Sequence, residues 1–214
     1  MSAIPTINAF YTPVDISAAE LDHAAWDRAP PTVITRYWSG DEAPQGRQAE
    51  ARIIWSPAAL AVRFVCRQDE PFVISSTPQT KTKSLGLWDR DVCEIFIAPN
   101  PADVDRYYEF EAAPTGEWID LALQAKPNGR ETDWKFHSGM SAAARVEEDK
   151  LTISMRIPWS DSIKKPKPGD KWRINLCRCI GSDPDRGYLA WQPTRTKEPN
   201  FHVPTAFGVL VFAE

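Results

Sequence analysis

The sequence has few cysteines and no long apolar run, and each shortage excludes a class of protein. Four cysteines among 214 residues are too few for a disulfide-stabilised scaffold. None is spaced as C-x-x-C, so we expect no zinc or redox site and interpret all four as small, reduced apolar residues. They are Cys66, Cys93, Cys177 and Cys179. Because no stretch of about 18 apolar residues occurs, a membrane-spanning helix is excluded.

Histidine is also scarce, and acidic residues outnumber basic ones by 29 to 25. The three histidines, His23, His137 and His202, have no H-x-H or H-x-x-x-H spacing, so a transition-metal triad is not expected. A net charge of −4 and a pI near 5.5 argue against a nucleic-acid-binding surface, because phosphate contacts need clustered Lys and Arg. Residues 1–6 contain neither a basic region nor an apolar core, so no signal peptide is expected. We therefore expect a cytoplasmic location unless the protein is exported by another route or processed.

Short β-branched and aromatic runs dominate what is present, and nineteen prolines punctuate them. The predicted strands are 32–38, 49–55, 60–67, 87–97, 106–112, 117–124, 136–146, 151–157, 171–179, 189–192 and 207–212. About ten short strands at roughly ten-residue spacing, with at most short helical turns, predict an all-β fold of two packed sheets. We expect an antiparallel β-sandwich, forming one domain over residues 1–214 with an extended lead-in at 1–31.

One predicted strand, 87–97, combines an aromatic side chain with a carboxylate. Residues 93, 95 and 97 form a wholly apolar face that should point into the core, whereas Glu94 lies on the opposite face between two apolar neighbours. A carboxylate in that setting is usually paired or solvated in a cleft, because burying it alone is costly. Trp88 has the same parity as Glu94, and an aromatic plate beside a hydrogen-bonding carboxylate can hold a sugar. The alternative is that Trp88 is a core or rim aromatic and Glu94 pairs with an arginine.

Several segments, in order, resemble carbohydrate-binding module family 9 and its stand-alone relatives. The most distinctive is Trp-Asp-Arg-Asp-Val-Cys-Glu-Ile-Phe-Ile at 88–97. The other matching segments are 25–29, 51–67 with Asp69, 108–111, 114–116, 156–159, 169–175, 190–194 and 201–208. Together they span nearly the whole chain.

The resemblance implies a β-sandwich that binds the end of a glycan without catalysing a reaction. In that family a sugar lies between two Trp rings and polar side chains contact its hydroxyls. Carried over to this sequence, Trp88 is one plate, Glu94 accepts hydroxyl hydrogen bonds, Trp191 is the opposing plate and Arg178 is a charged partner. The implied ligand is a mono- or oligosaccharide terminus, and no cofactor is required.

Calcium supports the structure of some family members, so hard-oxygen clusters are candidate sites. Two groups of closely spaced residues could supply such ligands. They are Asn100, Asp103 and Asp105, and separately Asp183 and Asp185. The alternative for both groups is an ordinary solvated turn.

A glycosidase would need two carboxylates flanking one bond, about 5–9.5 Å apart. Asp91 and Glu94 are three residues apart on a predicted strand and so face opposite sides. Glu109 and Glu111 do share a face, but their neighbours indicate a solvated surface. Catalysis is therefore not expected.

Two further alternatives remain. His202 is interpreted as structural, but Met155 with His202 could imitate the axial ligands of haem-binding sandwiches that resemble the N-terminal domain of dopamine β-monooxygenase. The chain could also be an interaction module that has lost its sugar and binds a protein partner or dimerises through exposed tryptophans. The oligomeric state is not predicted.

Overall fold

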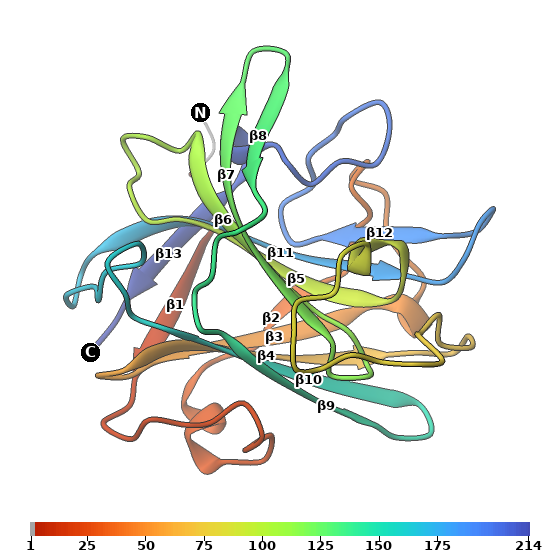
Figure 1. The fold of residues 1–214 in the computed structure, drawn as a ribbon, viewed down its shortest axis with the longest axis horizontal. Helices are drawn as coiled ribbons and strands as arrows, with labels where there is room; N and C mark the ends of the chain where they lie inside the picture. The colour runs from red at the N-terminus through yellow and green to blue at the C-terminus, as the bar shows by residue number, and fades with distance from the viewer. Residues whose placement is uncertain (1–2) are drawn as a thin grey trace.

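The structure is a computed structural model that describes residues 3–214, and these residues contain thirteen β-strands and four 3-10 turns (Figure 1). The strands are β1 (Thr6–Tyr11), β2 (Thr32–Ile34), β3 (Ala49–Trp55), β4 (Ala59–Arg67), β5 (Val92–Ala98), β6 (Arg106–Ala112), β7 (Trp118–Lys126), β8 (Gly129–Asp133), β9 (Ser141–Val146), β10 (Lys150–Pro158), β11 (Lys171–Ile180), β12 (Gly187–Ala190) and β13 (Gly208–Phe212). The turns are η1 (Ala24–Arg28), η2 (Gln45–Arg47), η3 (Leu87–Asp89) and η4 (Pro204–Ala206). None of these turns has the length and apolar character that crossing a bilayer requires.

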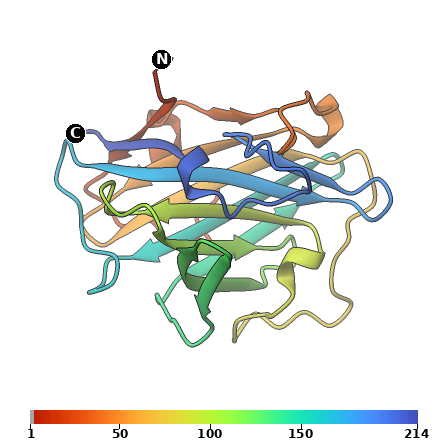
Figure 2. The ribbon, with the colours of Figure 1, turned by 90° about the horizontal axis from the view of Figure 1, so that it is seen from above.

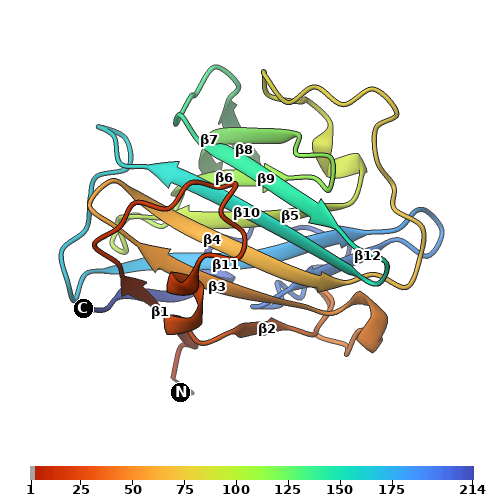
Figure 3. The ribbon, with the colours of Figure 1, turned by 90° about the horizontal axis from the view of Figure 1, so that it is seen from below.

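The strands form two layers that are joined by β1. The first sheet has the order β8-β7-β6-β5-β11-β13-β1, with β12 added beside β11 (Figure 2). The second has the order β1-β3-β4-β10-β9, with β2 added beside β3 (Figure 3). Residues 6–9 of β1 pair with β13 in the first sheet, and residues 10–11 pair with β3 in the second. The predicted sandwich is confirmed, but the pairing is not purely antiparallel because β1 is parallel to both neighbours.

The main core lies between the two sheets and follows the alternation of the strands. Cys93, Ile95 and Ile97 of β5 are completely buried there, as their shared apolar face predicts. Alternate residues of β10 and β4 in the second sheet belong to the same core. The predicted inward face of the central strand is therefore confirmed.

A second apolar cluster covers the outer face of the first sheet. Phe96, Tyr107 and Leu121 of three adjacent strands pack there with Phe201 and Phe207 from the segment that precedes β13. Both faces of β5 are consequently buried. A polar residue on the outer face of β5 or β6 thus lies under a cover of protein rather than in open solvent.

Three predicted features of the chain differ from the structure. The lead-in predicted at 1–31 contains the strand β1, and residues 125–133, where no strand is predicted, contain β8. The strand predicted at 87–97 begins only at Val92, because residues 87–89 form the turn η3. The residues of β8 are exposed or half-buried, because this edge strand pairs only with β7 among the described residues. A strand with little buried surface has little apolar alternation, so its sequence resembles that of a loop.

Candidate functional site

A pocket of about 500 Å³ opens on the outer face of the first sheet. Its lining combines carboxylates on the sheet with aromatic side chains at the mouth. The lining residues are Trp88, Asp89, Glu94, Glu109, Leu121, Arg130, Thr132, Trp134, Cys179, Tyr188, Pro199, Asn200, Phe201 and His202. This combination of a concave shape, apolar surface and a few convergent polar groups is typical of a small-molecule site.

Three glutamates form what we call the carboxylate floor: Glu94 on β5, and Glu109 and Glu111 on β6. Glu94 and Glu111 lie directly opposite each other in the β5–β6 pairing. The three side chains are 3%, 4% and 0% exposed, and one oxygen of each lies within 4.8 Å of the others. Like charges directly opposite each other destabilise a sheet, so the ionised floor is electrostatically unfavourable without a compensating group.

Burial shifts the pKa values of the carboxylate floor upward. It raises the pKa of Glu94 to about 7, against the opposing effect of a hydrogen bond from the Cys179 thiol at 3.2 Å. Burial, aided by the charge of Glu94, raises the pKa of Glu109 to about 8. The pKa of Glu111 is raised well above its usual range by burial and by both neighbouring carboxylates. Near neutral pH the floor can therefore both donate and accept hydrogen bonds.

His202 borders the same floor in its neutral form. Burial lowers the pKa of His202 to about 3, and Arg130 contributes to that shift. Its Nδ1 shares a hydrogen bond with the Tyr107 hydroxyl at 3.2 Å, and its Nε2 lies 4.0 Å from Glu109 Oε1. Because the imidazole is uncharged at neutral pH, it does not neutralise the carboxylate beside it.

Trp88 and Trp134 form an aromatic wall at the mouth. Their ring centroids are 6.1 Å apart, their planes are tilted by 49°, and the residues are 37% and 50% exposed. A sugar sandwiched between two rings needs about 7–8 Å between them, because carbon contacts lie at about 3.5–4.0 Å on each side. The two indoles therefore present one angled surface to the pocket instead of two facing plates.

Arg186 fixes the turn that presents Trp88. The turn η3 begins after Gly86, whose φ of 74° is a left-handed conformation that favours glycine. Arg186, from the connection between β11 and β12, donates hydrogen bonds to the carbonyl oxygens of Trp88 and Arg90 at 2.7 Å and of Asp89 at 3.1 Å. One guanidinium therefore holds three successive carbonyls of this turn, so Trp88 is presented by a tethered backbone.

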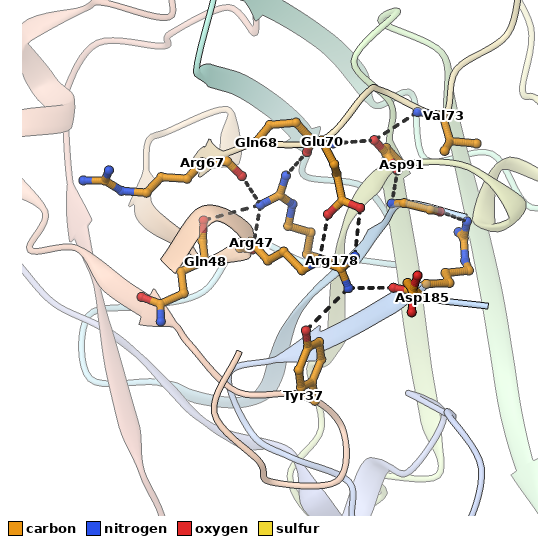
Figure 4. A network of polar contacts seen from close by, with 12 residues as sticks. Tyr37, Arg47, Gln48, Arg67, Gln68, Glu70, Val73, Asp91, Arg178 and Asp185 are labelled. Atoms are coloured by element: carbon orange, nitrogen blue, oxygen red, sulfur yellow. Dashed lines mark hydrogen bonds and ion pairs between the residues drawn. The ribbon is translucent and has the colours of Figure 1, made fainter. Parts of the chain in front are cut away.

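Trp88 and Glu94, two of the four residues predicted from the sequence, line this pocket, and Arg178 does not. Arg178 is 1% exposed and lies on the face of β11 that points between the sheets (Figure 4). It donates hydrogen bonds to the carbonyl oxygens of Arg47 and Arg67, each at 2.7 Å, and to the side chain of Gln68. Those contacts link the first sheet to the end of β4 in the second.

Trp191 is also outside the pocket lining. It is half-buried, packs against the core between the sheets, and its backbone N–H donates to the carbonyl of Leu176 at 2.8 Å. Its ring lies so close to Gly208 that a Cβ there would come within 2.4 Å of it. The aromatic neighbour of Trp88 is Trp134, which directly follows β8 and was missed with that strand.

The prediction that Glu109 and Glu111 form a solvated surface is wrong, because both are buried beside Glu94. A signal for this arrangement exists in the sequence. With the predicted strand ends at residues 97 and 106, a symmetrical hairpin places Glu94 opposite Glu109. The observed register is shifted by two residues and places Glu94 opposite Glu111, on the same face of the sheet. Asp91 does face away from Glu94, as predicted, and accepts a hydrogen bond from the backbone N–H of Gly181 at 2.7 Å.

Three of the five predicted calcium residues make contacts within the protein. Asn100 accepts a hydrogen bond from the backbone N–H of Ala102 at 3.1 Å, and Asp103 pairs with Arg106 at 3.2 Å. The carbonyl of Asp185 accepts from Arg47 at 2.7 Å. Calcium binding at these turns stays a prediction.

The haem alternative requires Met155 and His202 to face one another. Met155 is fully buried in the core between the sheets, whereas His202 lies over the outer face of the first sheet, against Phe96. The two side chains are therefore separated by a sheet and do not form a shared axial site.

A family model described as carbohydrate family 9 binding domain-like matches residues 18–214. The chain belongs to this family. Among solved structures, a family 9 carbohydrate-binding module from Caldicellulosiruptor kristjanssonii in complex with glucose is 17% identical, with a TM-score of 0.68 over 97% of this chain and 95% of the other. A cellotriose complex of a family 9 module from the same organism is 18% identical, with a TM-score of 0.65 over 98% and 94%.

A third structure comes from Bacteroides uniformis and has a provisional assignment as a carbohydrate-binding protein. It is 16% identical, with a TM-score of 0.75 over 98% of this chain and 100% of the other. No curated protein sequence matches. At these identities the similarity establishes that the family 9-like chain has the same fold, and the function must be argued from its own pocket.

Proposed function

We propose that this family 9-like sandwich binds the terminus of a mono- or oligosaccharide without catalysing a reaction. The observation that carries the proposal is the aromatic wall of Trp88 and Trp134 beside the carboxylate floor in one pocket. A pyranose has an apolar C–H face and a rim of hydroxyls, and this pocket offers a surface for each. The glucose and cellotriose complexes of structurally similar modules support the same class of ligand.

The sugar face stacks on the exposed indole of Trp134 or Trp88, and its hydroxyls reach Glu94 and Glu109. These two carboxyl groups have pKa values of about 7 and 8. Near neutral pH, each can therefore accept a hydrogen bond from a sugar hydroxyl when ionised, or donate one when protonated. Arg130, at the exposed side of the pocket, is the charged donor in place of the buried Arg178.

The arrangement of the carboxyl groups favours binding over hydrolysis. Glycosidases place an acid and a second carboxylate on opposite sides of the scissile bond. Here the three glutamates lie together on one floor, within 4.8 Å of each other, so they approach a ligand from the same side.

Calorimetric titration with glucose, cellobiose, xylobiose and the reduced disaccharide cellobiitol tests the proposal. We expect saturable binding of a disaccharide, and loss with cellobiitol would identify recognition of the reducing end. Trp134→Ala and Trp88→Ala should each weaken affinity about 5–150-fold, since aromatic contacts of this size contribute about 1–3 kcal/mol. Trp191→Phe, the matched control outside the pocket, should bind normally. Unchanged affinity in both pocket variants would refute the proposed site.

A further inference from the structure

The carboxylate floor has no cationic partner within the described residues. The ion pairs of this part of the chain place no Lys or Arg nitrogen within 4.0 Å of Glu94, Glu109 or Glu111, and the nearby His202 is neutral. Both carboxylate oxygens of Glu111 are buried, and as an ionised carboxylate Glu111 receives no hydrogen bond from a donor outside the floor. Glu111 is fully buried and points toward the other two carboxylates.

Other buried carboxylates of this chain are supplied with donors. Asp120, also fully buried, receives the backbone N–H and hydroxyl of Ser138 and pairs with Lys83 at 2.8 Å. Glu117 pairs with Arg90 at 3.2 Å and accepts the Thr115 hydroxyl. The fold therefore supplies donors to these buried acids, whereas an ionised Glu111 has none outside the floor. A positively charged ligand would supply the missing partner.

We propose that Glu94, Glu109 and Glu111 bind a divalent, oxygen-preferring cation of the calcium class at the floor of the pocket. Calcium binds carboxylate oxygens at about 2.3–2.6 Å, so two ligands of one ion are at most about 5.2 Å apart. One oxygen of each glutamate of the floor lies within 4.8 Å of the others, so all three can reach a single ion. Magnesium is usually held by only one or two carboxylates and demands near-ideal octahedral geometry, so a set of three carboxylates favours calcium.

The position of the floor gives the cation a route from solvent and open coordination positions. Glu94 and Glu109 line the pocket, whereas Glu111 lies beneath them. A cation held by all three faces the pocket, where water or another oxygen donor completes its coordination. This cation site uses Glu94 and Glu109, which the proposed function also assigns to sugar hydroxyls, but its argument does not require that function to be correct.

The test uses the full-length protein, treated with chelator and dialysed, without sugar. Calcium chloride is titrated by calorimetry, and terbium chloride is titrated while luminescence is read under tryptophan excitation, because Trp88 and Trp134 border the same pocket. We expect one site per chain and a higher melting temperature with calcium. Glu111→Gln should lower the affinity at least tenfold and remove the thermal shift, and near-UV circular dichroism checks that this variant is folded.

Glu148→Gln is the matched control, since Glu148 is an exposed acid in the turn between β9 and β10 and does not line the pocket. It should bind calcium and terbium as the parent does. Absence of binding at millimolar calcium overturns the inference, as does binding that survives Glu111→Gln. A protein that binds sugar but no cation would refute this cation site alone, and one that binds calcium but no sugar would refute only the proposed function.

Discussion

Replacing Arg178 by Met should destabilise the protein strongly without a specific loss of ligand binding. Its guanidinium donates to two backbone carbonyls at 2.7 Å and to Gln68, and Gln68 in turn donates to Asp91 at 3.0 Å (Figure 4). Gln68 and Asp91 are 4% and 1% exposed, so water cannot readily replace the lost donor. Each buried acceptor left without a donor costs about 1–3 kcal/mol, and we take about 3–5 kcal/mol for the group, the cost of removing one partner from a buried charged network.

For a chain of this length, each kcal/mol lowers the melting temperature by about 2–4 °C, so a fall of about 6–20 °C is expected. Differential scanning calorimetry measures the fall, and sugar titration well below the transition checks the site. Arg178→Lys keeps the charge but lacks the planar fork, so it should lie between the parent and Arg178→Met. A near-normal melting temperature combined with lost sugar affinity would refute this reasoning and place Arg178 at the sugar, as the sequence predicted.

Two further predictions concern the pocket and its surroundings. Arg186→Gln should weaken sugar affinity about 3–10-fold and lower the free energy of unfolding by about 1–2 kcal/mol, because the turn that carries Trp88 loses charged hydrogen bonds. Calorimetric titration measures the affinity, and an unaltered value would contradict this prediction. In chelator-treated protein, the free energy of unfolding should fall by roughly 2 kcal/mol between pH 6.5 and 8. Glu109, whose pKa is raised from 4.5 to about 8, holds its proton only in the folded state in this window, so its stabilisation is present below pH 4.5 and is lost as pH rises to 8. Urea unfolding at several pH values measures the free energy of unfolding, and a value that stays constant or rises from pH 6.5 to 8 would contradict the prediction. His202, whose pKa is lowered from 6.5 to about 3, makes stability rise with pH only below pH 6.5 and so does not mask the fall.

Local alternation was sufficient to predict much of the sandwich. The bounds of β3 and β6 match the predicted ranges, and the inward face of β5 is as expected, because each depends on a period of two within one segment. The pairing of β1 depends on strands about 45 and 200 residues further along the chain, and its parallel register has no local signal.

Within the site, Glu94 was identified from the alternation of its strand. Trp88 does line the pocket, but the strand parity that predicted it does not apply, because Trp88 lies in the turn η3 before β5. The burial of Glu109 depends on the apolar cluster that Phe201 and Phe207 complete from a distant segment, so its own neighbours could not reveal it. The sequence also could not show to which face of the sheet the Arg178 side chain points, for a related reason. Both faces of β11 are buried, and a strand with two buried faces does not show by composition which face is the inner one.

The claim that a sugar lies against Trp88 and Trp134 is tested most directly by following the indole N–H signals of the nine tryptophans in a two-dimensional NMR titration with cellobiose. Single Trp→Phe variants assign the signals. We predict saturable shifts of the Trp88 and Trp134 signals while the Trp191 signal stays in place. Shifts confined to Trp191, or none at saturating cellobiose and glucose, would contradict the proposed site.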